Sequence, residues 1–137
     1  MKKTNDGYYK NRHSCFLLQY HLVLVTKYRH PVITGELESF LRSYITEYFE
    51  ERECPVLAME TMPDHVHIQF EAQPQIQLSS FVNALKSASS RHVRQRFGEA
   101  LRPYYWKPYF WSLSYFICSV SEQSTQTVKK YIQEQKE

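Results

Sequence analysis

The stretch "MPDHVHIQF", residues 62–70, places two histidines two positions apart in a strand-like run. Successive side chains of an extended chain point to opposite faces, and the rise is ~3.3 Å per residue. His65 and His67 therefore lie on one face, about 6.6 Å apart along the backbone, where two imidazoles can bind one divalent metal ion. A half-buried strand with a polar face would give the same pattern, so the motif alone does not decide between the two interpretations.

The composition limits how the protein can bind a phosphate group. The 137 residues include 11 tyrosines but only three glycines, so a Gly-rich phosphate loop is excluded. The three cysteines, Cys15, Cys54 and Cys118, form no C-x-x-C pair, which argues against a disulfide framework and a zinc knuckle. No targeting signal and no apolar run of ~20 residues is present. We therefore expect a cytoplasmic protein.

Charge is unevenly distributed, although the net charge is only +3. Residues 36–60 are mainly acidic, whereas residues 86–107 carry six basic side chains and one acidic side chain. A basic face on a small domain is typical of polyanion binding, although a solvated helix surface is an equally good interpretation. The candidate nucleic-acid contacts are Lys86, Arg91 and Arg94 on a helix, and Lys27 and Arg29 at a strand end.

Apolar periodicity predicts a single domain over residues 1–137 with the order β-α-β-β-α-β-α. Strands are expected at 16–28, 55–62, 64–72 and 114–120, and helices at 34–52, 78–97 and near the C-terminus. Gly98 is expected to close the second helix, and residues 101–111 form an aromatic loop. This order predicts an α+β fold: a ferredoxin-like or RRM-like antiparallel sheet with packed helices.

Both ends of the chain are polar additions to this core. Residues 1–13 form a polar N-terminal tail, and residues 121–137 contain a linker and the C-terminal helix, capped by Ser121 or Ser124. Tyr131 and Gln135 are one helical turn apart and therefore share a face of that helix. A tyrosine in this position is ordinarily a packing residue.

Taken together, these motifs resemble the single-tyrosine HUH transposases of the insertion-sequence 200/605 family. The resemblance covers nearly the whole chain and rests on "YHLVLVTKYR", "MPDHVHIQF", "VNALKSASSR", "SYFICSVSEQ" and "VKKYIQEQ". It implies that Tyr131, on the C-terminal helix, is the catalytic nucleophile. It also implies that His65, His67 and Gln135 bind a divalent metal, either Mg²⁺ or Mn²⁺.

The resemblance further implies the reaction and the partners. The expected protein is a transposase of a prokaryotic cell that cuts and rejoins single-stranded DNA at insertion-sequence ends through a covalent 5′-phosphotyrosine. It recognises DNA hairpins and acts as a homodimer whose active sites are shared in trans, each tyrosine facing the partner's histidines. The long first strand could pair with its copy across the two-fold axis.

Two alternatives remain open at the level of sequence. His65 to Gln69 also fits H-x-H-x-Q, the pattern of histidine-triad nucleotidyl transferases, in which the central histidine is the nucleophile. A non-catalytic single-stranded nucleic-acid-binding module would use an RRM-like sheet with exposed aromatics and a basic flank. Only a tyrosine transposase would form a covalent tyrosine–DNA product.

Overall fold

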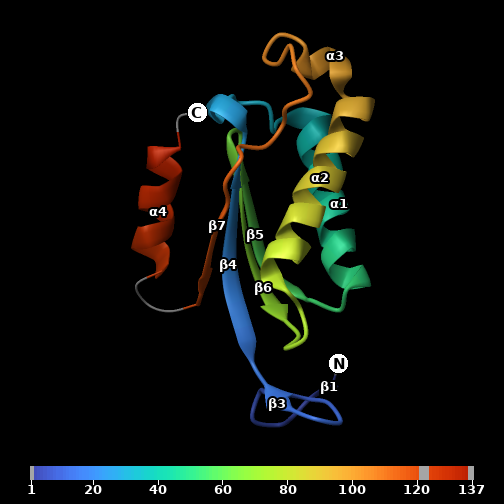
Figure 1. Ribbon diagram of the computed structural model, residues 1–137, viewed down its shortest axis with the longest axis vertical. Coiled ribbons are helices and arrows are strands. Elements are labelled where there is room, and N and C mark those ends of the chain that lie inside the picture. Colours follow the sequence, from blue (N-terminus) through green and yellow to red (C-terminus); the bar gives the residue numbers. More distant parts are fainter. Residues whose placement is uncertain (1, 121–123, 136–137) are drawn as a thin grey trace.

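The fold has one main sheet with helices on both faces (Figure 1). The structure, a computed structural model, describes residues 2–120 and 124–135. The strands of the main sheet lie in the order β5 (Val56–Met62), β6 (His65–Ala72), β4 (Leu18–Val25) and β7 (Phe116–Ser119). All neighbouring strands are antiparallel. This is the strand order of a ferredoxin-like sheet, so the predicted fold class is confirmed.

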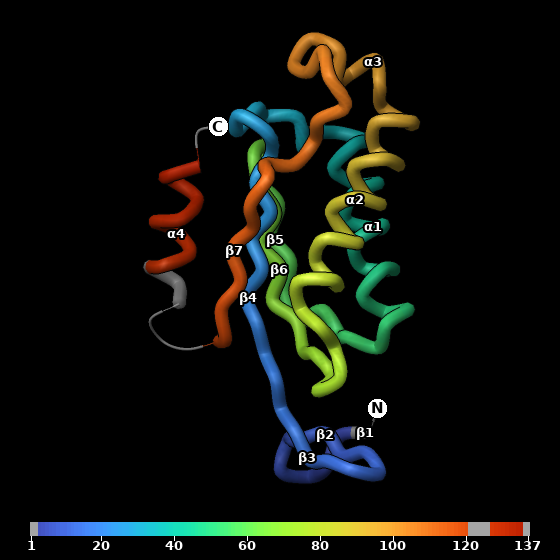
Figure 2. The backbone as a smooth tube through the Cα atoms, viewed as in Figure 1, coloured from blue at the N-terminus to red at the C-terminus, as the bar shows by residue number. Residues whose placement is uncertain are grey.

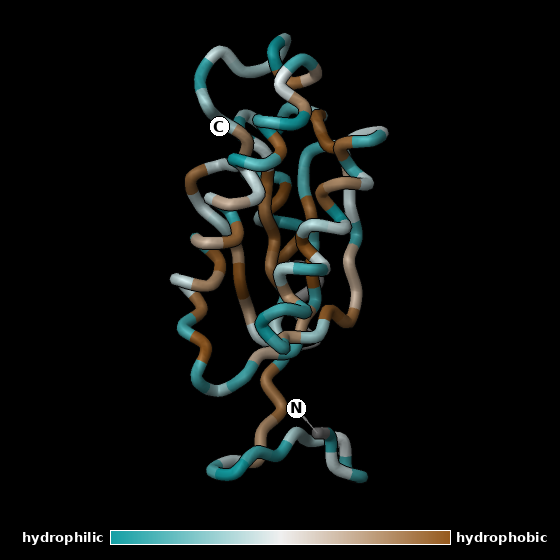
Figure 3. Tube along the Cα trace, turned by 90° about the vertical axis from the view of Figure 1, so that its right-hand side faces the viewer, coloured by the Kyte–Doolittle hydropathy of each residue, from teal (hydrophilic) through white to brown (hydrophobic). Residues whose placement is uncertain are grey.

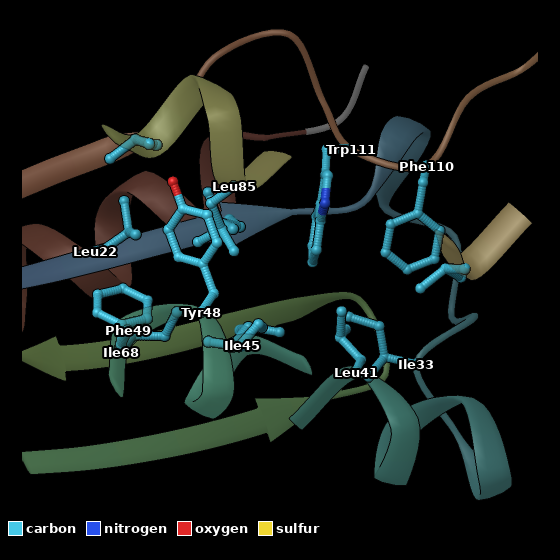
Figure 4. Packing of buried hydrophobic residues seen from close by; sticks show 14 of the residues in the cluster. Leu22, Ile33, Leu41, Ile45, Tyr48, Phe49, Ile68, Leu85, Phe110 and Trp111 are labelled. Atoms are coloured by element: carbon cyan, nitrogen blue, oxygen red, sulfur yellow. The ribbon is translucent and has the colours of Figure 1, made fainter. Parts of the chain in front are cut away.

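Helices α1 (Gly35–Glu51) and α2 (Leu78–Arg96) cover one face of the sheet, and α4 (Ser124–Glu134) covers part of the other (Figure 1). The large core lies between the sheet and the first two helices, where Phe49 and Leu85 meet Ile68 (Figure 4). A small second cluster joins Val128 of α4 to Val23 and Val25 of β4. Because strand side chains alternate, one face of the main sheet lies in the large apolar core and the other face is more polar.

The chain differs from the sequence prediction at several element ends. The first strand ends at Val25, and a 3-10 turn, η1 (Lys27–Arg29), follows it. Gly98 does not close α2 but begins a further short helix, α3 (Gly98–Leu101). β7 is shorter than the predicted strand at 114–120. The cap predicted at Ser121 lies outside the described residues, as does the Ser124 side chain.

The polar N-terminal residues form a small sheet that the sequence analysis did not predict. Its strands are β1 (Lys2–Lys3), β2 (Tyr9–Lys10) and β3 (Cys15–Phe16). This mostly hydrophilic segment extends from one end of the main sheet (Figures 2 and 3). The Tyr9 hydroxyl donates a 2.5 Å hydrogen bond to Glu71 Oε1, which ties the small sheet to the end of β6. Among the described residues, no helix is long and apolar enough to cross a membrane.

Candidate active site

His65 and His67 lie on the polar face of β6, the face that α4 partly covers. Their strand neighbours Val66 and Ile68 belong to the large core on the other face, as strand alternation requires. In the register of β4 and β6, Val25 is opposite His65 and Val23 is opposite His67. Because both valines also contact α4, the C-terminal helix packs directly beside the two histidines.

The turn before β6 orients the imidazole of His65. Asp64 Oδ1 lies 2.8 Å from His65 Nδ1, and Arg29 donates a 3.0 Å hydrogen bond from Nε to Asp64 Oδ2. Burial raises the pKa of Asp64, but the hydrogen bonds and charges of His65 and Arg29 outweigh burial and lower it. In the neutral tautomer whose Nδ1–H donates to this carboxylate, Nε2 of His65 is the nitrogen that can bind a metal. A carboxylate behind an imidazole is a frequent arrangement at metal sites.

His21 on β4 is a third histidine of this face, which the sequence analysis assigned no role. His21 Nδ1 lies 2.8 Å from His67 Nε2, and the two rings are 4.9 Å apart. Burial lowers the pKa of both histidines, and for His67 the proximity of His21 lowers it further. Both rings are therefore held in the neutral form that metal binding requires. Strand alternation could have revealed His21, because it shares the face of Val23 and Val25.

Tyr131 and Gln135 converge on one serine hydroxyl at the edge of the sheet. Ser114 Oγ lies 2.9 Å from the Tyr131 hydroxyl and donates a 3.4 Å hydrogen bond to Gln135 Oε1. Since a hydroxyl carries one proton, Tyr131 acts as donor to Ser114 whenever Ser114 donates to Gln135. The Tyr131 ring also packs on Phe116 of β7, with the centroids 5.2 Å apart. Ser114 belongs to no chemical motif of the sequence, so spacing alone does not predict its role.

Ser114 lies in an irregular stretch before β7. Val23 pairs with Phe116, and Thr26 forms an isolated bridge with Trp111. Two residues separate the positions on β4, whereas four separate those on the partner strand, so the chain bulges around Ser114. Such bulges redirect side chains and are frequent near active sites.

Lys86 has an internal role that the sequence analysis did not predict. Its ammonium donates hydrogen bonds to the carbonyls of Leu113 (2.9 Å) and Ser114 (3.3 Å). Burial lowers the pKa of this ammonium. Lys86 therefore links α2 to the bulge that presents Ser114 to Tyr131.

The other predicted DNA contacts fall into two groups. Arg29 is bound to Asp64 and also donates a 3.4 Å hydrogen bond to the Gln133 carbonyl of α4, so it supports the site. Lys27 lies over two tyrosine rings, and Arg94 donates a 3.2 Å hydrogen bond to Ser90 Oγ. Arg91 is exposed on α2. The structure thus separates Arg29 and Lys86, which bind carboxylate or backbone oxygens of the fold, from Arg91, which is exposed. Lys27 and Arg94 are partly buried.

The donor types fit a divalent metal ion, with one adjustment. Within the part of the chain that the structure describes, no group of three or more His, Cys, Asp or Glu side chains could hold a metal. The predicted set has two imidazoles and one amide. His65 offers Nε2, whereas His67 must either offer Nδ1 or exchange its contact with His21 for the metal. Gln135 Oε1 has a second lone pair beyond the one that Ser114 occupies.

Comparison with known proteins identifies the family. The model of the family described as "Transposase IS200 like" matches residues 14–135. This chain belongs to the IS200-like transposase family. The chain is 37% identical over 126 residues to the ISDra2 transposase TnpA of Deinococcus radiodurans, covering 92% of this chain and 89% of that protein. It is 30% identical to the IS200 transposase of Salmonella typhimurium, over 91% and 81% of the two chains.

Solved structures of transposases share the fold. The crystal structure of a candidate transposase from Deinococcus radiodurans R1 superposes with a TM-score of 0.85 at 35% identity, over 93% of this chain and 97% of that chain. A REP-associated tyrosine transposase, solved bound to a REP hairpin, superposes with a TM-score of 0.56 at 12% identity, over 90% and 68% of the two chains. The second likeness shows the shared fold alone.

Proposed function

We propose that this IS200-like transposase cuts and rejoins single-stranded DNA at insertion-sequence ends, with Tyr131 as the nucleophile. The observation that carries the proposal is the position of α4, which places Tyr131 on the sheet face that bears His65 and His67. The family match adds the class of reaction. DNA hairpins at the element ends are the proposed recognition elements, because a relative of the same fold was solved with a REP hairpin.

The reaction conserves the energy of the broken bond. The Tyr131 hydroxyl loses its proton and its oxygen attacks a DNA phosphorus, so that a 5′-phosphotyrosine bond forms and the phosphorus–O3′ bond breaks. The freed 3′ oxygen takes up a proton, which balances the proton lost by the phenol. Attack by a 3′-hydroxyl on the phosphotyrosine reverses the step, so rejoining requires no ATP. The phenol has an ordinary pKa of ~10 and is a weak nucleophile at neutral pH. Mg²⁺ or Mn²⁺, held by His65, His67 and Gln135, would stabilise the phenolate and polarise the phosphate.

A covalent-capture assay tests this proposal. The substrate is a labelled single strand covering the DNA that flanks the gene of this protein. Wild-type protein with Mg²⁺ or Mn²⁺ is expected to give a cleaved strand and a protein–DNA adduct that resists denaturation. Tyr131→Phe removes only the hydroxyl, so both products should be lost while DNA binding remains. His65→Ala and EDTA should each abolish cleavage.

The same assay distinguishes the alternatives. A histidine-triad nucleotidyl transferase would carry its adduct on His67 and would tolerate Tyr131→Phe. A non-catalytic binding module would retain the DNA but give neither product. Full cleavage in EDTA would contradict the metal site, and full cleavage by Tyr131→Phe would contradict the nucleophile.

We further propose a homodimer in which each active site combines residues of two subunits. In the structure α4 packs on β4 and β7 of its own chain, so the proposed dimer requires each α4 to make these same contacts on the sheet of the partner subunit. One expectation from the sequence is wrong: β4 lies between β6 and β7, so its two edges are paired and it offers no edge to a copy. Within the described residues, β5 and β7 are the edge strands of the main sheet and could pair with a partner.

A heterodimer tests for shared sites. One subunit carries Tyr131→Phe and the other carries His65→Ala with His67→Ala, and different tags allow the mixed dimer to be purified. If sites form in trans, one site receives both defects and the other receives none, so activity returns. If sites form in cis, each site has one defect and the heterodimer is inactive, which would refute the shared arrangement.

A further inference from the structure

Exposed aromatic side chains lie on η1, directly after β4, and on the loop that follows α3. Trp106 is 84% exposed, Tyr28 is 44% exposed and Tyr104 is 39% exposed. These three residues and the partly buried Tyr109 are called the aromatic platform below. Large aromatic side chains this exposed are unusual on a small domain and commonly mark a binding surface.

The platform rests on a fixed base. The Tyr28 and Tyr109 rings meet edge to face with centroids 6.0 Å apart, and Tyr109 contacts Tyr105 in the same way at 6.4 Å. Tyr105 is buried, and its hydroxyl donates a 2.7 Å hydrogen bond to the Lys27 carbonyl. The loop that carries Trp106 is therefore held against η1 by ring packing and by a hydrogen bond.

Tyr28 faces outward at a cost in backbone energy. Tyr28 and Arg29 have φ values of 60° and 55°, in the left-handed region that disfavours residues with a side chain. This conformation directs Arg29 inward to Asp64 while Tyr28 faces solvent. Strain of this kind persists where the surrounding contacts impose it, and it is concentrated at functional sites.

Cations lie over the platform rings. Lys27 Nζ lies 5.1 Å from the centroids of both Tyr28 and Tyr109, and Lys107 Nζ lies 4.7 Å from the Trp106 ring. Residues 101–110 contain Arg102 and Lys107 but no acidic residue. Exposed rings beside ammonium groups suit a ligand with flat, uncharged faces and a negatively charged backbone. Unpaired nucleotides have this chemistry.

The platform also adjoins the candidate active site. The Thr26 amide, directly before η1, donates a 3.0 Å hydrogen bond to the carbonyl of Asp64, the residue before His65. Arg29 binds the carboxylate of the same aspartate. Nucleotides on the platform can therefore belong to the strand whose phosphate lies at the histidines.

We propose that the aromatic platform stacks unpaired DNA bases next to the phosphate that is cut, with Lys27 and Lys107 neutralising the adjoining phosphates. This inference rests on the proposed function for the identity of the nucleic acid. It assigns substrate binding to the aromatic loop at 101–111.

A binding cycle without catalysis tests the inference. The probes are a labelled single-stranded oligo(dT) and its abasic counterpart, which has the same phosphates and no bases. Affinity is measured by fluorescence anisotropy in the Tyr131→Phe background without metal, so the outcome does not depend on cleavage. Trp106→Ala should weaken oligo(dT) binding about tenfold and leave abasic binding unchanged, because only a base can stack on the indole ring. Trp106→Phe should restore most of the loss.

Two controls make the test specific. Leu113→Ala removes a side chain that is 87% exposed and apolar but has no aromatic face, and it should leave both affinities unchanged. Lys107→Ala should weaken binding of both probes. The inference is overturned if Trp106→Ala weakens both probes equally, acts no more strongly than Leu113→Ala, or if oligo(dT) binds no better than the abasic strand. Covalent capture failing in wild type would instead contradict the proposed function.

Discussion

Ser114→Ala tests whether the serine hydroxyl holds the catalytic helix in place. The substitution removes the 2.9 Å contact with the Tyr131 hydroxyl and the 3.4 Å contact with Gln135. It leaves the apolar attachment of α4 intact, because Val128 is 4% exposed and still packs on Val23 and Val25. The helix should therefore loosen without leaving the sheet.

The size of the effect follows from the two contacts. A hydrogen bond of ordinary length contributes ~1 kcal/mol net, and one near 3.4 Å contributes little. A loss of ~1 kcal/mol corresponds to about a fivefold decrease in the equilibrium constant for docking of α4. Formation of the covalent adduct should slow by about the same factor, because Tyr131 then spends less time on the histidine face.

Hydrogen exchange of the α4 amides measures docking, and single-turnover capture measures the reaction. Ser114→Thr keeps the hydroxyl and should preserve both values. Ser43→Ala, at an exposed position of α1, is the matched control and should change neither. Unchanged α4 exchange in Ser114→Ala, or an equal effect of Ser43→Ala, would show that the Ser114 hydroxyl does not hold the helix in place.

Three further predictions concern stability, DNA binding and metal binding. Burial raises the pKa of Glu71, but its hydrogen bonds, of which the one from Tyr9 has the largest effect, lower this pKa overall. The same hydrogen bond is the main cause that raises the pKa of Tyr9 to about 12. A carboxyl with a lowered pKa stabilises the fold above its unfolded pKa and loses this contribution as pH falls through its folded pKa. Tyr9→Phe should therefore lower the free energy of unfolding in urea by ~1.5–3 kcal/mol at pH 7 and by less below pH ~4. An equal loss at both pH values would contradict this. Arg91→Ala should reduce the salt dependence of DNA binding by about one unit, whereas Lys86→Ala should not, because its ammonium binds carbonyls; equal slopes would reject the distinction. His21→Ala should change Mn²⁺ affinity measured by calorimetry, since His21 contacts a proposed ligand; an unchanged affinity would remove His21 from the site.

The sequence was sufficient for the fold because its core elements have strong periodicity. Helix α1 lies within one residue of its predicted bounds, and the alternation that placed His65 and His67 on one face follows directly from strand geometry. The N-terminal sheet was missed because strands of two residues have no detectable period. The position of β4 between two strands depends on pairing across the chain, which periodicity does not contain.

The candidate site was only partly predictable for a related reason. His21 and Ser114 are distant in sequence from the residues that they contact, and no local motif includes them. Arg29 and Lys86 show that a basic residue in a basic segment need not face the ligand. Arg29 binds the Asp64 carboxylate, and Lys86 binds backbone carbonyls. These are tertiary contacts, which the distribution of charges along the sequence does not reveal.

Peptide mapping of the protein–DNA adduct identifies the nucleophile on which the proposed reaction depends. Wild-type protein is incubated with the flanking DNA strand and Mg²⁺ or Mn²⁺, both polymers are digested, and the modified peptide is sequenced by mass spectrometry. We expect a nucleotide attached through its 5′ phosphate to Tyr131 and to no other tyrosine. An adduct on a histidine or on another of the tyrosines, or cleavage with no adduct, would contradict this expectation.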